Sequence, residues 1–376
     1  MTDLINYITF YADFMQVFYS SKKVDTLQYS VGESGWHILG TRRVVFGGVH
    51  GKLTLRGTNK YGTNGATFMF GTNAEVVCTG DIRTLVDYSN YDRTDTSEAM
   101  FNDLFKDCKQ LIFPPELYSG KLANGCFQSM FEGCSILKEA PKLPAEKMAD
   151  SCYASMFKGC TSLKNPPKLP SIELDKYCYM SMFQECISLI KTPELPAEEL
   201  ADFCYSHMFE GCSSLKYLVG LQAVKMATGS CLRMLKDCSS LIGTSSFLAT
   251  ELADYCCAEM FKGCSAITLL TPTELLAKKM FRFCYCSMFE DCTSLKEAPK
   301  LPAEELADSC YKSMFKGCTS LHYVTILATD INKDECIKDW LVNTATTGTL
   351  YKNKKAQWQD KDVIPANWEI KEIDAE

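Results

Sequence analysis

The sequence is poor in the features that usually mark catalysis or a metal site. Its 376 residues include four tryptophans and four histidines, and the histidines (His37, His50, His207 and His322) are scattered without any Cys/His metal spacing around them. No nucleophile elbow, P-loop or Gly-x-Gly-x-x-Gly fingerprint is present. We therefore expect no enzyme activity, no metal and no cofactor.

Long apolar runs and a surplus of positive charge are also absent. No stretch approaches the ~20 apolar residues of a membrane-spanning helix, and the first residues, MTDLINY, lack the pattern of a secretory signal. The formal net charge of -7 argues against a nucleic-acid partner, because such a partner requires a basic surface. We therefore expect no membrane insertion, no nucleic-acid binding and no export signal in this sequence.

Cysteine, in contrast, is abundant, with 21 residues. Nine of them stand in one register, with seven gaps of 26 residues and one of 28: Cys108, Cys134, Cys160, Cys186, Cys212, Cys238, Cys264, Cys292 and Cys318. A fixed period of this length is typical of a repeat architecture. Because the cysteines follow the repeat, we interpret most of them as reduced, buried thiols that pack as small hydrophobic groups, rather than as disulfides.

Each repeat combines an apolar stripe with a proline-containing segment. In the copy at 301–327, Leu306, Cys310, Met314 and Cys318 lie four residues apart. This spacing predicts an amphipathic helix, and Gly317 is placed to terminate it. Proline recurs in the other half of the repeat, at positions 115, 141, 167, 193 and 299. Since proline removes a hydrogen bond from a sheet, we expect a strand of roughly three or four residues before it.

One short strand and one helix per 26-residue repeat predict an α/β repeat solenoid of the leucine-rich-repeat type. Strands stack about 4.8 Å apart and helices roughly 8–10 Å apart, so we expect the stack to curve, with the strands on a concave inner face. Residues 1–95 show short alternating strands between glycine-rich turns and predict a β-sandwich-like domain. The predicted solenoid spans 96–327. A small cap at 328–376 would contain a short helix through Val342 and a strand at 346–351.

The pattern LPAxxLADxCYxxMFxGCTSLKxAPxLP resembles the BspA-like leucine-rich repeat proteins of gut and oral bacteria and of the phages that infect them. The resemblance covers about 99–327, and the segments on either side resemble, the first more weakly, the modules that flank such repeats. It implies adhesion or recognition at a bacterial surface.

The residue after the recurring leucine is expected to point outward from the inner strands. This column comprises Ile112, Lys138, Lys164, Ile190, Lys216, Ile242, Thr268, Lys296 and His322. With members of the next column, it predicts a partner-binding surface that contains Phe113, Lys138, Lys164, Lys191, Tyr217, Lys296, His322 and Tyr323. Phe113, Tyr217 and Tyr323 would be its aromatic anchors. The alternative interpretation of such mixed charge is an ordinary solvated face.

We therefore expect a non-catalytic binding or structural protein. The resemblance and the missing export signal favour a phage virion surface component, such as a fibre, decoration or receptor-binding protein, made in the host cytoplasm and carried on the virion surface. Its partners would be a protein or glycan on a host surface and other virion proteins, and a homo-oligomer is an open option. The alternatives are a BspA-like adhesin on the bacterial cell surface and an intracellular protein-binding scaffold.

Overall fold

The computed structural model describes residues 6–244, 247–268, 273–358 and 363–374. The chain divides into two compact units, which are treated separately below. Unit 1 comprises Met1–Ser171 and Met182–Leu189, and unit 2 comprises Ile172–Ser181 and Ile190–Glu376. Both contain strands and turns, unit 1 also contains short 3-10 helices, and the described residues contain no α-helix.

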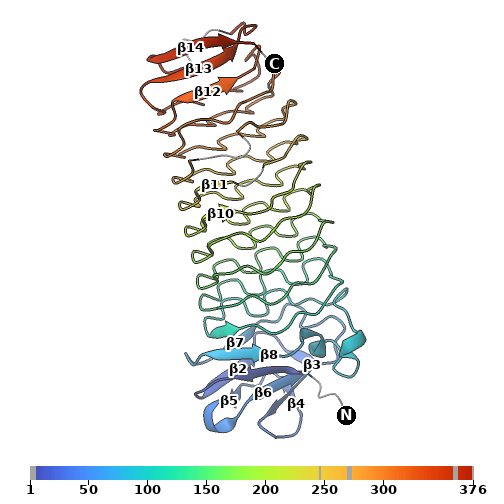
Figure 1. Ribbon diagram of the computed structural model, residues 1–376. Coiled ribbons are helices and arrows are strands. Elements are labelled where there is room, and N and C mark those ends of the chain that lie inside the picture. The colour runs from blue at the N-terminus through green and yellow to red at the C-terminus, as the bar shows by residue number, and fades with distance from the viewer. Residues whose placement is uncertain (1–5, 245–246, 269–272, 359–362, 375–376) are drawn as a thin grey trace. The chain divides into compact units, whose positions relative to one another are not determined.

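Unit 1 begins with two sheets (Figure 1). The larger sheet has the order β4-β3-β6-β1-β8-β9 and the smaller one the order β5-β2-β7. The pairing is antiparallel except between β8 and β9. The elements of this region are β1 (Ile8–Tyr11), β2 (Gln16–Ser20), β3 (Val24–Val31), β4 (His37–Gly40), β5 (Val44–Phe46), η1 (Gly48–His50), β6 (Leu53–Arg56), β7 (Phe68–Phe70), β8 (Val76–Thr79), η2 (Ile82–Leu85), η3 (Tyr91–Arg93) and β9 (Leu111–Phe113).

Phenylalanine rings from both sheets meet in one core. Phe10 of the larger sheet lies 5.6 Å from Phe18 and 5.4 Å from Phe70 of the smaller sheet, measured between ring centroids. Strands thus form where the sequence predicted a β-rich region. The larger sheet continues through β9, which belongs to the first repeat, so its strands come from both sides of the predicted boundary at 95/96. That boundary stays a prediction.

The predicted helix of each repeat is wrong. Every fourth residue of the segment has a left-handed backbone, as at Ser151 (φ 55°), Ser155 (φ 56°) and Gly159 (φ 71°). An α-helix requires a negative φ at every position. The segment is instead a chain of overlapping turns with a period of four residues, here called the turn ribbon.

Backbone hydrogen bonds alternate along the turn ribbon between two kinds of partner. The N–H of Met130 closes a turn on the carbonyl of Phe127 (3.2 Å), whereas the next N–H, of Phe131, donates to Met156 in the following coil (2.9 Å). Unit 2 repeats the pattern, since Phe315 donates to Trp340 of its following coil (2.9 Å). Both sets of N–H groups are therefore satisfied inside the protein, as a buried backbone requires.

The side chains assigned to the helical stripe are nevertheless buried, because a four-residue period also returns them to one face. Met156 and Phe157 have no exposed surface. Rings in neighbouring coils stack almost parallel, with centroids 5.6 Å apart for Phe131 and Phe157. The predicted curvature rested on the wider spacing of helices. Without helices in the described residues, that argument for a concave face no longer holds.

All 21 cysteines are free thiols, and only Cys286 is not fully buried. Thiols of the main column donate to a carbonyl of the preceding coil, as Cys160 does to Phe131 (3.1 Å) in unit 1 and Cys264 to Leu235 (3.1 Å) in unit 2. Burial raises the pKa of the Cys108 thiol to about 12, which keeps it protonated. The structure agrees with the prediction that these cysteines are packing residues.

Three of the glycines at the end of the turn ribbon follow an aspartate at the same position of the preceding coil. A Cβ on Gly133 would overlap the carboxylate of Asp107, and both residues have a positive φ. The same close approach occurs in unit 2, in the pairs Asp237 with Gly263 and Asp291 with Gly317. Glycine is required here because the aspartate occupies the space of its side chain.

The predicted strand of each repeat is reduced to isolated parallel bridges in several of the described coils. Examples in unit 2 are Lys191 with Tyr217 and Leu195 with Leu221. A short pair of strands forms between β10 (Tyr217–Leu218) and β11 (Gly243–Thr244). The prolines that follow explain the brevity, because they cannot donate to a neighbouring strand.

Unit 2 ends in a parallel sheet of β12 (Tyr323–Ile326), β13 (Gly348–Asn353) and β14 (Trp368–Ile373) (Figure 1). The strand predicted at 346–351 is thus present as β13. The short helix predicted through Val342 is wrong, because that segment is one more coil of the turn ribbon, with positive φ at Asp339 and Asn343.

Two tryptophans cover the last coils of unit 2. Trp358 and Trp368 are buried, and their indole Nε1–H groups donate to the carbonyls of Ala328 (3.0 Å) and Ala345 (2.9 Å). Each large side chain therefore excludes water without leaving its polar atom unpaired.

Substitutions of Ser155 can distinguish a turn ribbon from a helix. Ser155→Gly is expected to be more stable than Ser155→Ala by about 1 kcal/mol, because glycine adopts a positive φ without steric cost. Chemical denaturation measures both free energies of unfolding. The matched control is Lys158, whose φ is not positive, and where alanine should be the more stable replacement. If Ser155→Ala had a larger free energy of unfolding than Ser155→Gly, as expected at Lys158, the turn ribbon would be contradicted.

The burial of the thiols predicts their reactivity. Titration with an aromatic disulfide reagent at mildly alkaline pH should detect about one fast thiol in the native protein, assigned to Cys286, and all 21 after denaturation without reductant. Cys286→Ala should abolish the fast reaction. A large shortfall after denaturation would reveal disulfides and contradict the packing role.

Candidate functional site

Backbone hydrogen bonds join residues of the predicted outward column on successive coils, but Ile112, its first member, is only 7% exposed, so the prediction that it points outward is wrong. The N–H of Lys138 donates to the carbonyl of Ile112 (3.0 Å) in unit 1. In unit 2, Lys216 donates to Ile190 (2.9 Å) and Ile242 donates to Lys216 (3.2 Å). The side chains of one column therefore lie at the same place on successive coils, as the sequence predicted.

Tyr217 is the most exposed aromatic residue of the predicted surface. Its side chain is 53% exposed, and Ile190 and Ile242 in the column beside it are 47% and 43% exposed. Lys191, also exposed, pairs with Tyr217 through a backbone bridge. The structure therefore brings apolar and basic side chains of three coils together in what is here called the Tyr217 face.

A second group of predicted residues lies beside the C-terminal sheet of unit 2. The rings of His322 and Tyr323 have centroids 4.5 Å apart. The backbone N–H of His322 donates to the backbone carbonyl of Lys296 (3.1 Å). Tyr323 is 41% exposed, and Lys296 is also exposed. Lys296, His322 and Tyr323 therefore lie close together. In the chain, the coils that contain Gly243 and Thr268 separate them from Tyr217.

Phe113 in unit 1 has a different setting. It is half-buried in the wall of a groove of about 360 Å³, together with Tyr118, Glu116, Glu139 and Lys142. Lys138 and Lys164 are exposed on the following coils, and no described ion pair holds either of them. Phe113 is therefore a groove-lining residue rather than an exposed anchor.

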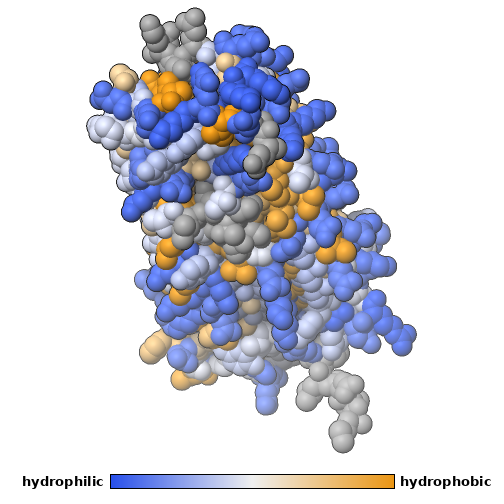
Figure 2. Space-filling model, turned by 45° about the horizontal axis from the view of Figure 1, so that its top comes forward, coloured by the Kyte–Doolittle hydropathy of each residue, from blue (hydrophilic) through white to orange (hydrophobic). Residues whose placement is uncertain are grey.

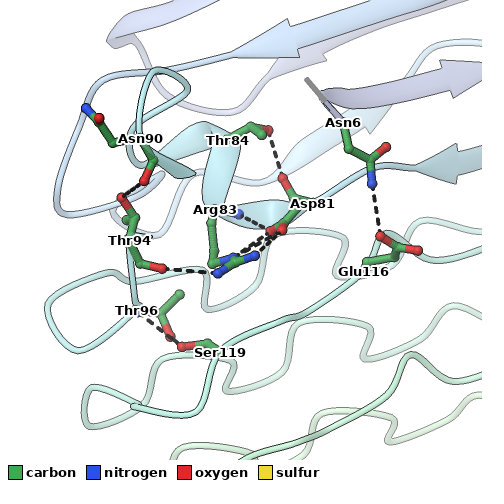
Figure 3. A network of polar contacts seen from close by, with 9 residues as sticks. All are labelled: Asn6, Asp81, Arg83, Thr84, Asn90, Thr94, Thr96, Glu116 and Ser119. Atoms are coloured by element: carbon green, nitrogen blue, oxygen red, sulfur yellow. Dashed lines mark hydrogen bonds and ion pairs between the residues drawn. The ribbon is translucent and has the colours of Figure 1, made fainter. Parts of the chain in front are cut away.

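Polar contacts fix the wall of this groove (Figure 3). The Asp81 carboxylate is almost fully buried and receives the guanidinium of Arg83, with the shortest contact at 2.6 Å. Asn6 donates to Glu116 (3.0 Å) from the start of the described chain. The hydrogen bonds that Arg83 donates to the Asp81 carboxylate also raise the pKa of Arg83. Of these contacts, the one between Asn6 and Glu116 holds a residue that lines the groove.

Unit 2 contains another groove that the sequence analysis did not predict. It has a volume of about 510 Å³ and is lined by residues of opposite charge, among them Lys278, Lys279, Glu304 and Glu305. The lining carries no histidine or cysteine. Among the described residues, no three His, Cys, Asp or Glu side chains are grouped so as to hold a metal ion.

Sequence analysis also missed an aromatic column on the turn ribbon of unit 2. Tyr177 stacks on Phe203 with centroids 5.3 Å apart, and Tyr255 stacks on Phe283 at 4.7 Å. All four have a φ between 55° and 58°, where other coils have small residues such as Gly229. A bulky residue in this conformation is strained, and such strain often marks contact sites. The sequence signal was an aromatic residue directly before the first cysteine of the repeat.

The visible face of the molecule is mainly hydrophilic, with apolar residues in separate patches (Figure 2). No helix in the described residues is long and apolar enough to span a membrane.

No family model and no curated protein matches the sequence. A leucine-rich repeat protein from Bacteroides ovatus is 18% identical, with 73% of this chain and 70% of that chain covered and a TM-score of 0.34. TLR13 in its complex with ssRNA13 is 13% identical, with 74% of this chain and 42% of that chain covered and a TM-score of 0.30.

These structural neighbours are leucine-rich repeat proteins. At such TM-scores the likeness carries no argument about function, and the chain spans less than half the length of TLR13. Membership of the BspA-like family stays a prediction.

The buried ion pair at the groove predicts a large loss of stability on truncation. Asp81→Ala should lower the free energy of unfolding by about 3 kcal/mol, because it leaves the partly buried Arg83 unpaired. Chemical denaturation should also show that Asp81→Ala combined with Arg83→Ala costs less than the sum of the two single variants. Full additivity would mean that the two side chains act independently.

Proposed function

We propose that this protein is a non-catalytic recognition protein that binds its partner through exposed side chains on a repeated scaffold. One observation carries the proposal: the inward positions repeat from coil to coil while the outward positions vary. Met208, Met234 and Met260 have the same buried place in three coils of unit 2. The outward column changes from Lys216 to Ile242 to Thr268 over the corresponding coils.

A constant core with a varied surface is how repeat proteins adapt one architecture to different partners. The Tyr217 face is the strongest candidate contact, because it combines an exposed aromatic ring with aliphatic and basic neighbours. The partner proposed is a protein or glycan on a host surface. No nucleic acid is proposed, since the chain carries a formal net charge of -7.

The biological setting proposed is the surface of a phage particle, with other virion proteins as additional partners. Support comes from the thiols: a chain with 21 free cysteines is suited to folding in a reducing cytoplasm. A phage protein folds there and reaches the exterior by lysis of the host. The runner-up settings are a BspA-like adhesin on the bacterial cell surface and an intracellular binding scaffold.

Mass spectrometry of purified phage particles tests the setting. Peptides of this chain at structural copy number are the expected result. Their absence from particles combined with their presence in bacterial envelope fractions would contradict the virion proposal and favour the adhesin. Detection only in the soluble fraction of bacteria would favour the scaffold.

A cell-binding assay tests the recognition surface. With fluorescently labelled protein and candidate host cells, Tyr217→Ala is expected to weaken binding by about tenfold or more, as the loss of an aromatic anchor does. The matched control is Tyr11→Ala, because Tyr11 is similarly exposed but belongs to unit 1 outside the repeats. Equal binding by Tyr217→Ala and the wild type would remove the Tyr217 face from the proposal.

A further inference from the structure

The parallel sheet of unit 2 has an open edge at β14 (Figure 1). β14 pairs with β13 on one side, and no described residue forms a bridge to it on the other. The carbonyl of Ile373 accepts the N–H of Lys354 (2.8 Å), so the backbone groups of Ile373 face β13. Because this direction alternates along a strand, the N–H and C=O of Ile370 and Glu372 point toward the open edge. Such an edge is a template for one more strand.

The side chains of the sheet also show that a strand can be added. Val324, Leu350 and Ile370 occupy the same register position on β12, β13 and β14. Val324 is 1% exposed and Leu350 is fully buried, but Ile370 is 36% exposed. The apolar column of the sheet is therefore uncovered at its last strand. β14 has no proline and pairs with β13 without a bulge, so neither of these devices blocks its edge.

We propose that β14 pairs with β14 of a second copy of this chain, in antiparallel orientation around a two-fold axis. The two three-stranded sheets would then become one continuous sheet. An axis perpendicular to the sheet keeps every side chain on its own face, so one residue of β14 must lie opposite itself. The inference is independent of the partner and of the biological setting proposed above.

The charges of β14 select the register of this pairing. With Ile370 opposite Ile370, Glu369 of each copy lies opposite Lys371 of the other copy, which is a stabilising cross-strand pair. A register centred on Glu369, Lys371 or Glu372 would instead place like charges directly opposite each other. The backbone agrees with the first register, because the N–H and C=O of Ile370 both face the edge and can be exchanged between the two copies.

Local attraction at the edge has to overcome the formal net charge of -7 on each chain. At physiological ionic strength, exposed charges are largely screened beyond a Debye length of about 8 Å. Within one strand, the Lys371 ammonium already lies 3.1 Å from the Glu369 carboxylate. In the proposed register, the two pairs form a cluster of alternating sign. The edge thus attracts a second copy at short range, where the distant charges contribute little.

The joint is small, so we expect weak association. The N–H of Trp368, at the start of β14, is already engaged by the carbonyl of Pro365 (3.0 Å), which shortens the new ladder. A single pair of strands buries little surface, and we expect a dissociation constant on the order of tens of micromolar.

Sedimentation velocity of the full chain over roughly 1–300 µM tests the proposal. The wild type should change from monomer to dimer with concentration. Lys371→Glu and Glu369→Lys should each weaken dimerisation by about tenfold or more, because by symmetry each change turns two attractive pairs into repulsive ones. An equimolar mixture of the two variants should restore association as a heterodimer, since opposite charges then face each other again.

These variants also separate local pairing from net charge. Lys371→Glu makes the chain more acidic and Glu369→Lys makes it less acidic, so an effect of net charge alone would weaken one dimer and strengthen the other. The matched control is Glu305→Lys, at an exposed position on an earlier coil of unit 2. It changes the net charge as Glu369→Lys does and should dimerise at least as tightly as the wild type.

Ile370→Pro tests the backbone of the edge. Proline removes the N–H that points away from β13, a place where an edge strand tolerates it. The variant should be monomeric with the circular dichroism spectrum and melting temperature of the wild type. A wild type that stays monomeric throughout the concentration range would overturn the proposal. So would a dimer unaffected by Lys371→Glu and Glu369→Lys, or a mixture of these two variants that fails to associate.

Discussion

The structure depends on how the backbone of the turn ribbon satisfies its hydrogen bonds. Alternate N–H groups close turns within a coil, and the others donate to the following coil, as Phe131 does to Met156. A single coil therefore leaves half of its donors unpaired, and burial without partners costs free energy for each of them. Neighbouring coils stabilise each other, which is why the architecture exists only as a stack within each unit.

Several features of the sequence follow from this close stacking. Cysteine fits the narrow core and donates to a carbonyl of the preceding coil, as Cys160 does to Phe131. Glycine is needed wherever an aspartate of the preceding coil occupies the space of a side chain, as at Gly133 beside Asp107. Phenylalanine rings stack in register because each coil repeats the position of the last. The composition of the repeat thus reflects spacing set by hydrogen bonds rather than by helix packing.

The outward surface is free of these constraints, and its variation carries the functional proposals. The Tyr217 face and the column of Tyr177, Phe203, Tyr255 and Phe283 place exposed or strained aromatic residues where other coils have different side chains.

The sequence by itself determined the period, the buried residues and the outward column. These depend on spacing, and the inward set of Cys310, Met314 and Cys318 returns to one face at a period of 3.6 or of four. For the same reason the sequence did not separate helix from turns, since positions four apart drift only about 40° around a helix. The positions with a positive φ gave no consistent signal, because they hold serine in one coil, as at Ser309, and bulky residues such as Phe203 and Arg233 in others. Only the tertiary structure decided between helix and turns, because the turn ribbon requires a neighbouring coil to accept half of its hydrogen bonds.

The tertiary structure also decided which side chains meet. Phe113 became part of a groove, whereas Tyr217 remained exposed beside the aliphatic side chains of two adjacent coils.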